Sequence, residues 1–214
     1  MDKSELKKIG ILGGTFDPPH LAHLRIAEEV REVFNLEKIL FIPAGYPPHK
    51  KTGFSSFENR FEMTKLAIED NPFFEALGIE KEEKPSYTLK TLQKLKTLYP
   101  FLDLYLIIGW DSFCEFETWW HYEKFLDYTK IIVVSREIED WNEAEEYFLK
   151  KIKELWKKQD IKNKVYFYRA VALNISGTLI RRLCSQGRSI RYLVPENVYK
   201  YIIKKGLYRS ERES

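Results

Sequence analysis

The chain has 214 residues, of which 44% are hydrophobic and 31% are charged, and its formal net charge is +3. This length and composition are typical of one globular domain with a sizeable core. The small net charge gives no reason to expect a nucleic acid as partner. The chain has two cysteines and no uninterrupted apolar run of about 18 residues, so we expect a cytoplasmic protein without a membrane segment or a thiolate metal site.

Short runs of β-favouring residues alternate with amphipathic helical patterns along the chain. The expected strands are residues 9–12, 39–42, 104–108, 131–134 and 165–168. The expected helices are residues 24–34, 57–68, 88–98 and 141–156, followed by a helical C-terminal segment over 173–214 with breaks at Gly187 and Pro195. This alternation predicts an α/β fold, a Rossmann-like parallel sheet with helices on both faces, in a single domain over residues 1–214.

The segment Gly-Gly-Thr-Phe-Asp-Pro-Pro-His-Leu-Ala-His, residues 13–23, directly follows the first expected strand. Gly13 and Gly14 allow a ligand to approach the backbone closely. The helix that follows offers unpaired N–H groups and a partial positive charge, and His20 and His23 would share one face of its first turn. The combination predicts a polyphosphate site, with a purely structural histidine pair as the alternative. No third side chain stands at a metal-ligand spacing.

A second segment near the C-terminus reads Asn-Ile-Ser-Gly-Thr-Leu-Ile-Arg, residues 174–181. Ser176 is a good N-cap for a helix, and Arg181 comes about one turn later. Arg181 could therefore hold an anion at that helix N-terminus with two hydrogen bonds. An ordinary capped helix with a surface arginine is the alternative interpretation.

Together, in this order, the two segments resemble the nucleotidyltransferases with a (His/Thr)-x-Gly-His signature, and among these the bacterial nicotinate-nucleotide adenylyltransferases. The resemblance spans nearly the whole chain and includes residues 47–50, 85–92, 107–112, 118–119, 192–198, 201–202 and 206–208. Several positions depart from the family pattern, among them Glu137 and Ile138 after Arg136, Lys90, and one position in each of the two segments. Ala22 stands where the family usually has Gly between the histidines, and Gly177 stands where Ser or Ala is more frequent.

The resemblance implies transfer of AMP from ATP to nicotinate mononucleotide in NAD biosynthesis, with release of pyrophosphate and with Mg²⁺ accompanying ATP. It implies His20, His23 and Arg181 as the catalytic residues, which would donate hydrogen bonds to phosphate oxygens. The residues it implies for ATP binding are Gly13, Gly14, Thr15, Phe16, Gly109, Asp111, Arg136, Ser176 and Thr178. Those it implies for nicotinate mononucleotide are Lys50, Tyr87, Thr88 and Trp119, whose indole would stack on the pyridine ring.

The attacking phosphate of such a reaction is already ionised, so a general base is not required. Catalysis would rest on in-line alignment of two anions, without a covalent intermediate, and on neutralising charge on the leaving pyrophosphate. Two alternatives stay open, a sister adenylyltransferase that prefers nicotinamide mononucleotide and a non-catalytic sensor that binds ATP. The sequence also leaves open whether the chain forms a homo-oligomer, and whether Trp119 serves as a core aromatic instead.

Overall fold

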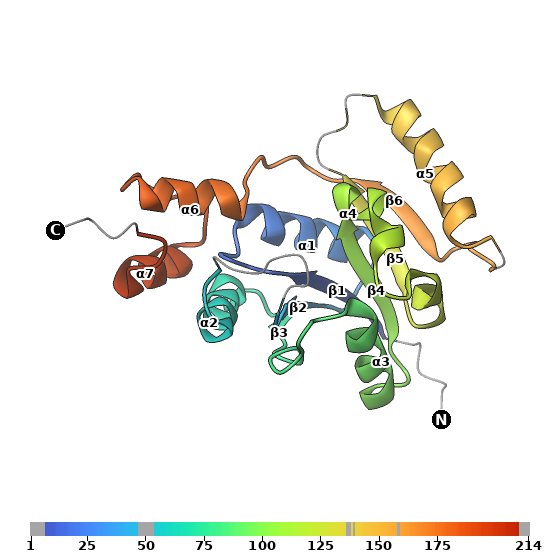
Figure 1. The fold of residues 1–214 in the computed structure, drawn as a ribbon, viewed down its shortest axis with the longest axis horizontal. Coiled ribbons are helices and arrows are strands. Elements are labelled where there is room, and N and C mark those ends of the chain that lie inside the picture. Colours follow the sequence, from blue (N-terminus) through green and yellow to red (C-terminus); the bar gives the residue numbers. More distant parts are fainter. Residues whose placement is uncertain (1–6, 47–53, 136–137, 139, 158, 210–214) are drawn as a thin grey trace.

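The computed structural model describes residues 7–46, 54–135, 138, 140–157 and 159–209 (Figure 1). Its sheet contains the strands β1 (Lys8–Gly14), β2 (Lys38–Pro43), β3 (Phe74–Ala76), β4 (Asp103–Gly109), β5 (Lys130–Ser135) and β6 (Val165–Arg169). All neighbouring pairs are parallel, in the order β3-β2-β1-β4-β5-β6. This order reverses between β1 and β4, as in the Rossmann fold. The predicted parallel sheet is confirmed.

The five predicted strands correspond to β1, β2, β4, β5 and β6. The edge strand β3 was not predicted, because a strand of three residues is too short to show an alternating pattern. Strand β3 extends the sheet beyond β2, where Leu40 pairs with Glu75.

The helices of the described residues are α1 (Leu21–Val33), α2 (Phe57–Ile68), α3 (Thr88–Leu98), α4 (Trp110–Cys114), α5 (Trp141–Leu155), α6 (Gly177–Ser185) and α7 (Glu196–Lys205), with the 3-10 turns η1 (Phe116–Thr118) and η2 (Tyr122–Asp127). The predicted bounds of α2 and α3 are confirmed to the residue. The helical C-terminal segment contains α6 and α7, separated at Gly187 and Pro195 as expected. The short elements α4, η1 and η2 were not predicted, because none is long enough to show helical periodicity.

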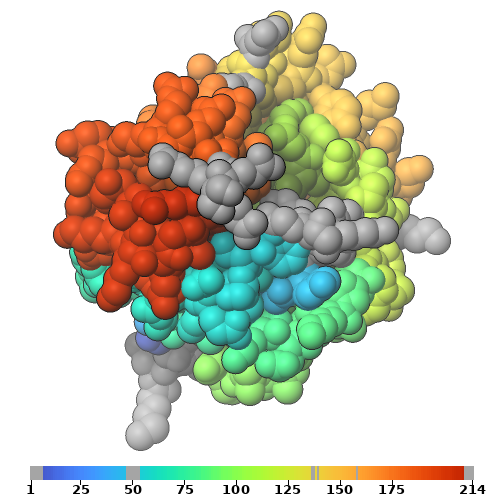
Figure 2. Space-filling view, turned by 60° about the vertical axis from the view of Figure 1, so that its left-hand side comes forward, coloured from blue at the N-terminus to red at the C-terminus, as the bar shows by residue number. Residues whose placement is uncertain are grey.

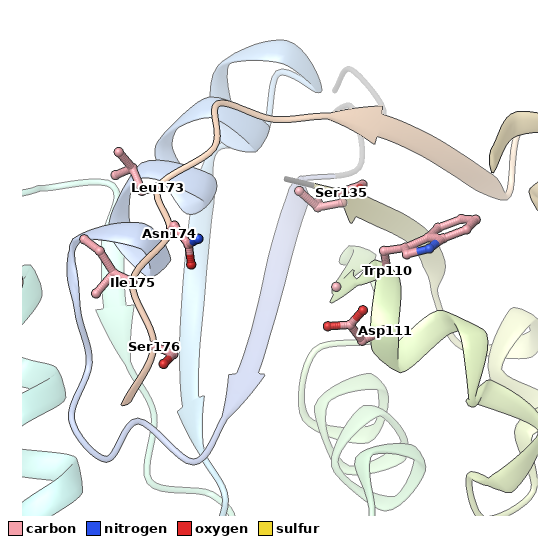
Figure 3. A pocket seen from close by; sticks show the side chains of 9 residues that line it. Trp110, Asp111, Ser135, Leu173, Asn174, Ile175 and Ser176 are labelled. Atoms are coloured by element: carbon pink, nitrogen blue, oxygen red, sulfur yellow. The ribbon is translucent and has the colours of Figure 1, made fainter. Parts of the chain in front are cut away.

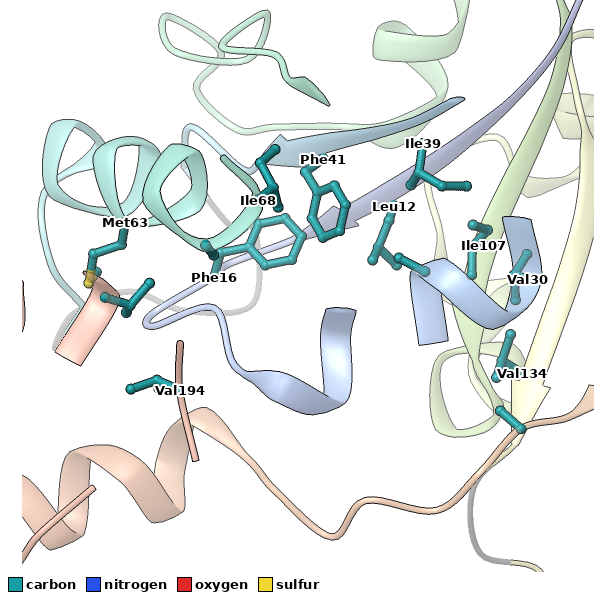
Figure 4. Packing of buried hydrophobic residues seen from close by; sticks show 14 of the residues in the cluster. Leu12, Phe16, Val30, Ile39, Phe41, Met63, Ile68, Ile107, Val134 and Val194 are labelled. Carbon is teal, nitrogen blue, oxygen red and sulfur yellow. The ribbon is translucent and has the colours of Figure 1, made fainter. Parts of the chain in front are cut away.

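Side chains of the central strands alternate between two cores, one on each face of the sheet. On β4, Leu104 and Leu106 join the core covered by α3, α4 and α5, whereas Tyr105 and Ile107 join the core covered by α1, α2, α6 and α7. Figure 4 shows the second core, with Ile107 beside residues of the neighbouring strands and helices. Burial on both faces explains the nearly continuous apolar sequence of these strands.

The connection from β6 to α6 passes over α1, so that the chain returns to the side of the sheet where it began (Figure 1). Helix α7 then lies next to α2, as the space-filling view shows (Figure 2). One bond between these helices joins Tyr201, whose hydroxyl donates to Asn59 Oδ1 at 2.9 Å. This return brings the segment before α6 to the carboxyl ends of the strands. No helix within the described ranges is long and apolar enough to cross a lipid bilayer.

Candidate active site

The two histidines of the first motif stack against each other at the start of α1. His20 is the N-cap residue, with extended φ and ψ of −146° and 169°, and the helix begins at Leu21. The backbone N–H of His20 donates to Nδ1 of His23 at 3.2 Å. The ring centroids are 3.6 Å apart, with an angle of 20° between the planes. The two imidazoles therefore form one unit at the helix N-terminus, as the three-residue spacing indicated.

The bond to Nδ1 fixes the tautomer of His23. A backbone N–H can only donate, so Nδ1 of His23 must be unprotonated to accept it. In the neutral ring the proton is then on Nε2, which makes this nitrogen a hydrogen-bond donor. The edge of Phe16 supports the same ring, with centroids 5.1 Å apart and planes at 76°. His23 is thus held in an orientation and a protonation state suited to an anionic acceptor.

The glycine turn at the end of β1 is open at Gly13 and packed against Phe16 at Gly14. A Cβ placed on Gly13 would have no heavy atom within 4 Å, and one on Gly14 would lie 3.2 Å from the ring of Phe16. Phe16 adopts a positive φ of 48° and is buried. This conformation is uncommon for a residue with a side chain, and it directs the ring into the core while the turn passes over it.

The second motif contacts the first through Arg181. Nη1 of Arg181 donates to the carbonyl oxygen of Asp17 at 2.6 Å, and Nη2 donates to Thr178 Oγ1 at 3.3 Å. Ser176 is the N-cap of α6, and its Oγ accepts from the N–H of Leu179 at 3.1 Å. Gly177 stands where the family more often has Ser or Ala, and the structure explains the glycine. A Cβ at this position would lie only 3.0 Å from the Asp17 carbonyl oxygen. The two segments are therefore in direct contact.

The side chain of Arg60 holds the glycine turn in place through hydrogen bonds, a role that was not predicted from the sequence. This residue of α2 has no exposed surface. Its guanidinium donates to the backbone carbonyl oxygens of Ser55 at 3.0 Å, Thr15 at 2.9 Å and Gly45 at 3.1 Å. Burial lowers the pKa of Arg60, and the charge of Asp17 opposes that shift. Arg60 joins the glycine turn to the connection between β2 and α2, a role that a lone arginine in a helical pattern does not reveal.

A cleft of about 290 Å³ opens beyond the carboxyl ends of β4 and β5. In Figure 3 the residues before α6 form one wall, with Asn174 and Ser176, and α4 forms the other, with Asp111. Gly109 also lines it, and no heavy atom lies within 4 Å of a Cβ placed there. The cleft lies beside the point where the strand order reverses, which is where ligands bind in open α/β sheets. Gly109, Asp111 and Ser176 are thus brought together as expected.

The wall before α6 is held by Glu29 of α1. Its carboxylate accepts from the Tyr168 hydroxyl at 2.8 Å and from the N–H of Val171 at 3.2 Å. Desolvation, and then the bond to Glu29, raise the pKa of Tyr168 to about 12. Glu29 is buried, so these donors offset the cost of removing a carboxylate from water. No sequence motif identifies Glu29 as the residue that holds this wall.

The residues predicted for the mononucleotide lie around the start of α3 and after η1. Tyr87 is the N-cap of α3 and Thr88 its first residue. Trp119 is partly buried and packs on Phe116, with ring centroids 5.1 Å apart. The more exposed neighbour Trp120 stacks on Tyr87 at 5.1 Å. None of these side chains lines the cleft of Figure 3. Lys50 and Arg136 fall outside the described residues.

Comparisons with known proteins identify relatives along most of the chain. The cytidylyltransferase-like family model matches residues 11–183. A protein of Dictyoglomus thermophilum named "Probable nicotinate-nucleotide adenylyltransferase" is 44% identical over 94% of this chain and 99% of its own length. The chain belongs to the nicotinate-nucleotide adenylyltransferase family. It is therefore an enzyme of the nucleotidyltransferase class.

Other members of the nicotinate-nucleotide adenylyltransferase family match equally well. The relative from Geotalea daltonii is 43% identical, and the match covers 96% of this chain and 100% of its own. Among solved structures, the nicotinic acid mononucleotide adenylyltransferase of Plasmodium falciparum in complex with NaAD superposes with a TM-score of 0.76. That pair is 22% identical, with 94% of this chain and 97% of the other covered, and it supports the fold.

Proposed function

We propose that this protein transfers AMP from ATP to nicotinate mononucleotide, which forms nicotinate adenine dinucleotide and pyrophosphate for NAD biosynthesis. The observation that carries the proposal is the 2.6 Å bond from Arg181 to the Asp17 carbonyl oxygen. It joins the segment with the stacked histidines to the helix N-terminus at Ser176. An anion placed between them would meet several donors at once. This is the arrangement that transfer of a nucleotidyl group requires.

In this proposal the triphosphate of ATP lies along the glycine turn. The backbone of Gly13, Gly14 and Thr15 approaches it closely, with Phe16 beneath, and the imidazoles of His20 and His23 donate to its oxygens. The N-terminus of α6 contributes Ser176 and Thr178. Arg181, held by Asp17, neutralises charge that grows on the leaving pyrophosphate. The N-terminal partial charge of both helices adds to this effect.

The nucleoside end of ATP would enter the cleft of Figure 3. Gly109 gives the ribose room, and Asp111 supplies a hydrogen-bond acceptor for its hydroxyls. Arg136, which follows β5, is proposed to contact the nucleotide as well. The mononucleotide would bind nearer Tyr87 and Thr88, with Trp119 stacked on the pyridine ring and Lys50 near its phosphate. Its phosphate then attacks the α-phosphorus in line with the departing pyrophosphate.

Enzymes of this class typically use a divalent metal, and we propose that Mg²⁺ arrives with ATP. Within the described ranges no three His, Cys, Asp or Glu side chains gather as a metal site would require. Mg²⁺ bound to nucleotides keeps most of its ligands as phosphate oxygens and water, and needs one or two carboxylates. Asp111, exposed at the cleft, fits that need. The cation would supply further charge neutralisation to the triphosphate.

The test is pyrophosphate release with ATP, Mg²⁺ and one acceptor at a time. We expect turnover with nicotinate mononucleotide to exceed that with nicotinamide mononucleotide, and phosphopantetheine to give none. Preference for nicotinamide mononucleotide would instead support the sister adenylyltransferase. ATP binding without pyrophosphate release from any acceptor would support the sensor. We further propose that the chain acts as a single domain in the cytoplasm, with small molecules rather than nucleic acids as partners.

A further inference from the structure

The chain turns back on itself after α7 and places one tyrosine against α2. Gly206 ends the helix in the left-handed conformation with φ 64°, and the N–H of Leu207 donates to the Ile202 carbonyl oxygen at 3.1 Å. Tyr208 also has a positive φ of 64°. Its hydroxyl lies 3.9 Å from the sulfur of Met63. A residue with a side chain is seldom found in this region, so packing must hold the ring in place.

The hydroxyl of Tyr208 donates to Oδ1 of Asp17 at 2.5 Å, across 191 residues of sequence. The same carboxylate accepts from the N–H of Ser55 through Oδ2 at 3.2 Å. The Asp17 carbonyl oxygen accepts from Arg181 at 2.6 Å. Asp17, which follows the glycine turn, therefore contacts three other segments of the chain through hydrogen bonds. One of them is the segment after α7 that contains Tyr208.

The side chain of Asp17 is 1% exposed, and Nη1 of Arg181 lies 4.0 Å from its Oδ2, so protein groups take the place of water around this carboxylate. A buried carboxylate that loses one donor rearranges to regain another partner or destabilises its surroundings. Desolvation, and then the negative charge of Asp17, raise the pKa of Tyr208. The phenol thus keeps its proton at neutral pH and remains a donor. The backbone carbonyl of the same residue accepts from Arg181, and His20 follows three residues later, so a shift of the Asp17 backbone would reach both motifs.

We propose that Tyr208 is a positioning residue for the triphosphate site, which acts by fixing the carboxylate of Asp17. This role rests on the proposed function, because it assumes that the turn containing Asp17 binds ATP. It assigns a role to the Gly-Leu-Tyr segment at residues 206–208. Tyr208 itself does not touch the substrates. The competing interpretation is that Tyr208 only secures the C-terminal helix on α2.

Tyr201→Phe is a matched control for Tyr208→Phe. Each substitution removes one buried or half-buried hydroxyl near α7, but the Tyr201 hydroxyl donates to Asn59 on α2 and not to Asp17. Both variants are compared with the unchanged protein by calorimetric binding of α,β-methylene-ATP with Mg²⁺, by steady-state kinetics and by thermal unfolding.

We expect Tyr208→Phe to weaken binding of the ATP analogue on the order of tenfold, in keeping with loss of a hydrogen bond to a charged group. The KM for ATP should rise in parallel, while the KM for nicotinate mononucleotide changes less than about twofold. Tyr201→Phe should lower thermal stability and leave analogue binding unchanged. Equal analogue affinity in the two variants would overturn the proposal.

The analogue experiment is independent of turnover, so it separates this proposal from the proposed function. If the unchanged protein binds the analogue but transfers AMP to no acceptor, the function fails and the comparison of the two variants still decides the role of Tyr208. If Tyr208→Phe does not fold, Asp17→Asn takes its place, because the amide keeps one acceptor oxygen where the carboxylate used two. Analogue affinity equal to that of the unchanged protein in Asp17→Asn would then overturn the proposal.

Discussion

Nη1 of Arg181 lies 2.6 Å from the carbonyl oxygen of Asp17, although 164 residues of sequence separate them. The bond is partly buried, and the same guanidinium reaches Thr178 at 3.3 Å. Two of its donors are thereby committed to the protein and hold the plane of the fork fixed. The remaining N–H groups are presented in one orientation to an anion at the turn. This preorganisation is the physical basis of the first prediction.

Arg181→Lys should lower kcat/KM for ATP by roughly 10²–10³, because an ammonium keeps the charge but cannot hold Asp17 and phosphate in a planar fork. The measurement is steady-state pyrophosphate release at varied ATP. Arg182→Lys is the control, since this arginine is exposed on the same helix. A loss below about threefold in Arg181→Lys would show that the fork geometry contributes little.

His23 can be tested with two substitutions that separate its two nitrogens. His23→Asn places an amide oxygen near the position of Nδ1, where it can accept from the His20 N–H, but it lacks the Nε2 donor. His23→Ala loses both. We expect kcat to fall by about 10²–10³ in each, as for other donors to a developing anion. His23→Ala should also lose about 0.5–2 kcal/mol of unfolding free energy through the helix cap, and His23→Asn less.

If His23→Asn retains full activity, then the role of His23 is confined to the cap. Chemical denaturation of both variants, run beside the kinetic assay, provides the comparison.

Gly109→Ala should affect nucleotide binding without affecting folding. A methyl group at this position meets no heavy atom within 4 Å, but Gly109 lines the cleft at the end of β4. The added carbon would occupy space proposed for the ribose. We expect the KM for ATP to rise about tenfold, comparable to the 1–3 kcal/mol that one methylene is worth in a pocket. Thermal unfolding should stay within the error of the unchanged protein, and an unaltered KM would place the nucleoside elsewhere.

Glu80 predicts a pH dependence of stability. Desolvation raises the pKa of this buried carboxyl above its ordinary value of 4.5, against the opposing bond from Thr91 Oγ1 at 2.5 Å. Between the unfolded and the folded pKa, the folded state binds more protons than the unfolded state. The contribution of protonated Glu80 to stability is therefore present below pH 4.5 and is lost as pH rises through the folded pKa.

Glu80→Gln removes this ionisation and keeps an acceptor for Thr91. The difference in unfolding free energy between Glu80→Gln and the unchanged protein should grow as pH rises from 4.5 toward neutrality, in favour of the amide. Urea denaturation at several pH values measures it. Glu83→Gln is the opposite case, because Lys94 lowers the pKa of Glu83 and that stabilisation is lost as pH falls. A difference for Glu80→Gln that is constant with pH would contradict the shifted pKa.

The local sequence determined the strands that alternate with helices, the glycine turn and the N-cap at Ser176. Each depends on residues within a few positions of one another, such as the apolar run before Gly13 or the serine that precedes a helical pattern. Periodicity failed where elements were too short to repeat, as at β3 and over residues 110–127. The candidate residues of both motifs could be identified from the sequence, because each motif is one continuous stretch, and the family resemblance then assigned their roles.

Tertiary structure alone decided how distant groups meet. Arg60, Glu29 and Tyr208 act through backbone and carboxylate atoms up to 191 residues away, and nothing in their immediate sequence identifies those partners. The protonated nitrogen of His23 likewise follows from a single bond distance. Sequence patterns report which side of a helix or strand is buried, since burial repeats with the period of the element. Pairing of single polar atoms has no such period, so it became visible only when the chain was folded.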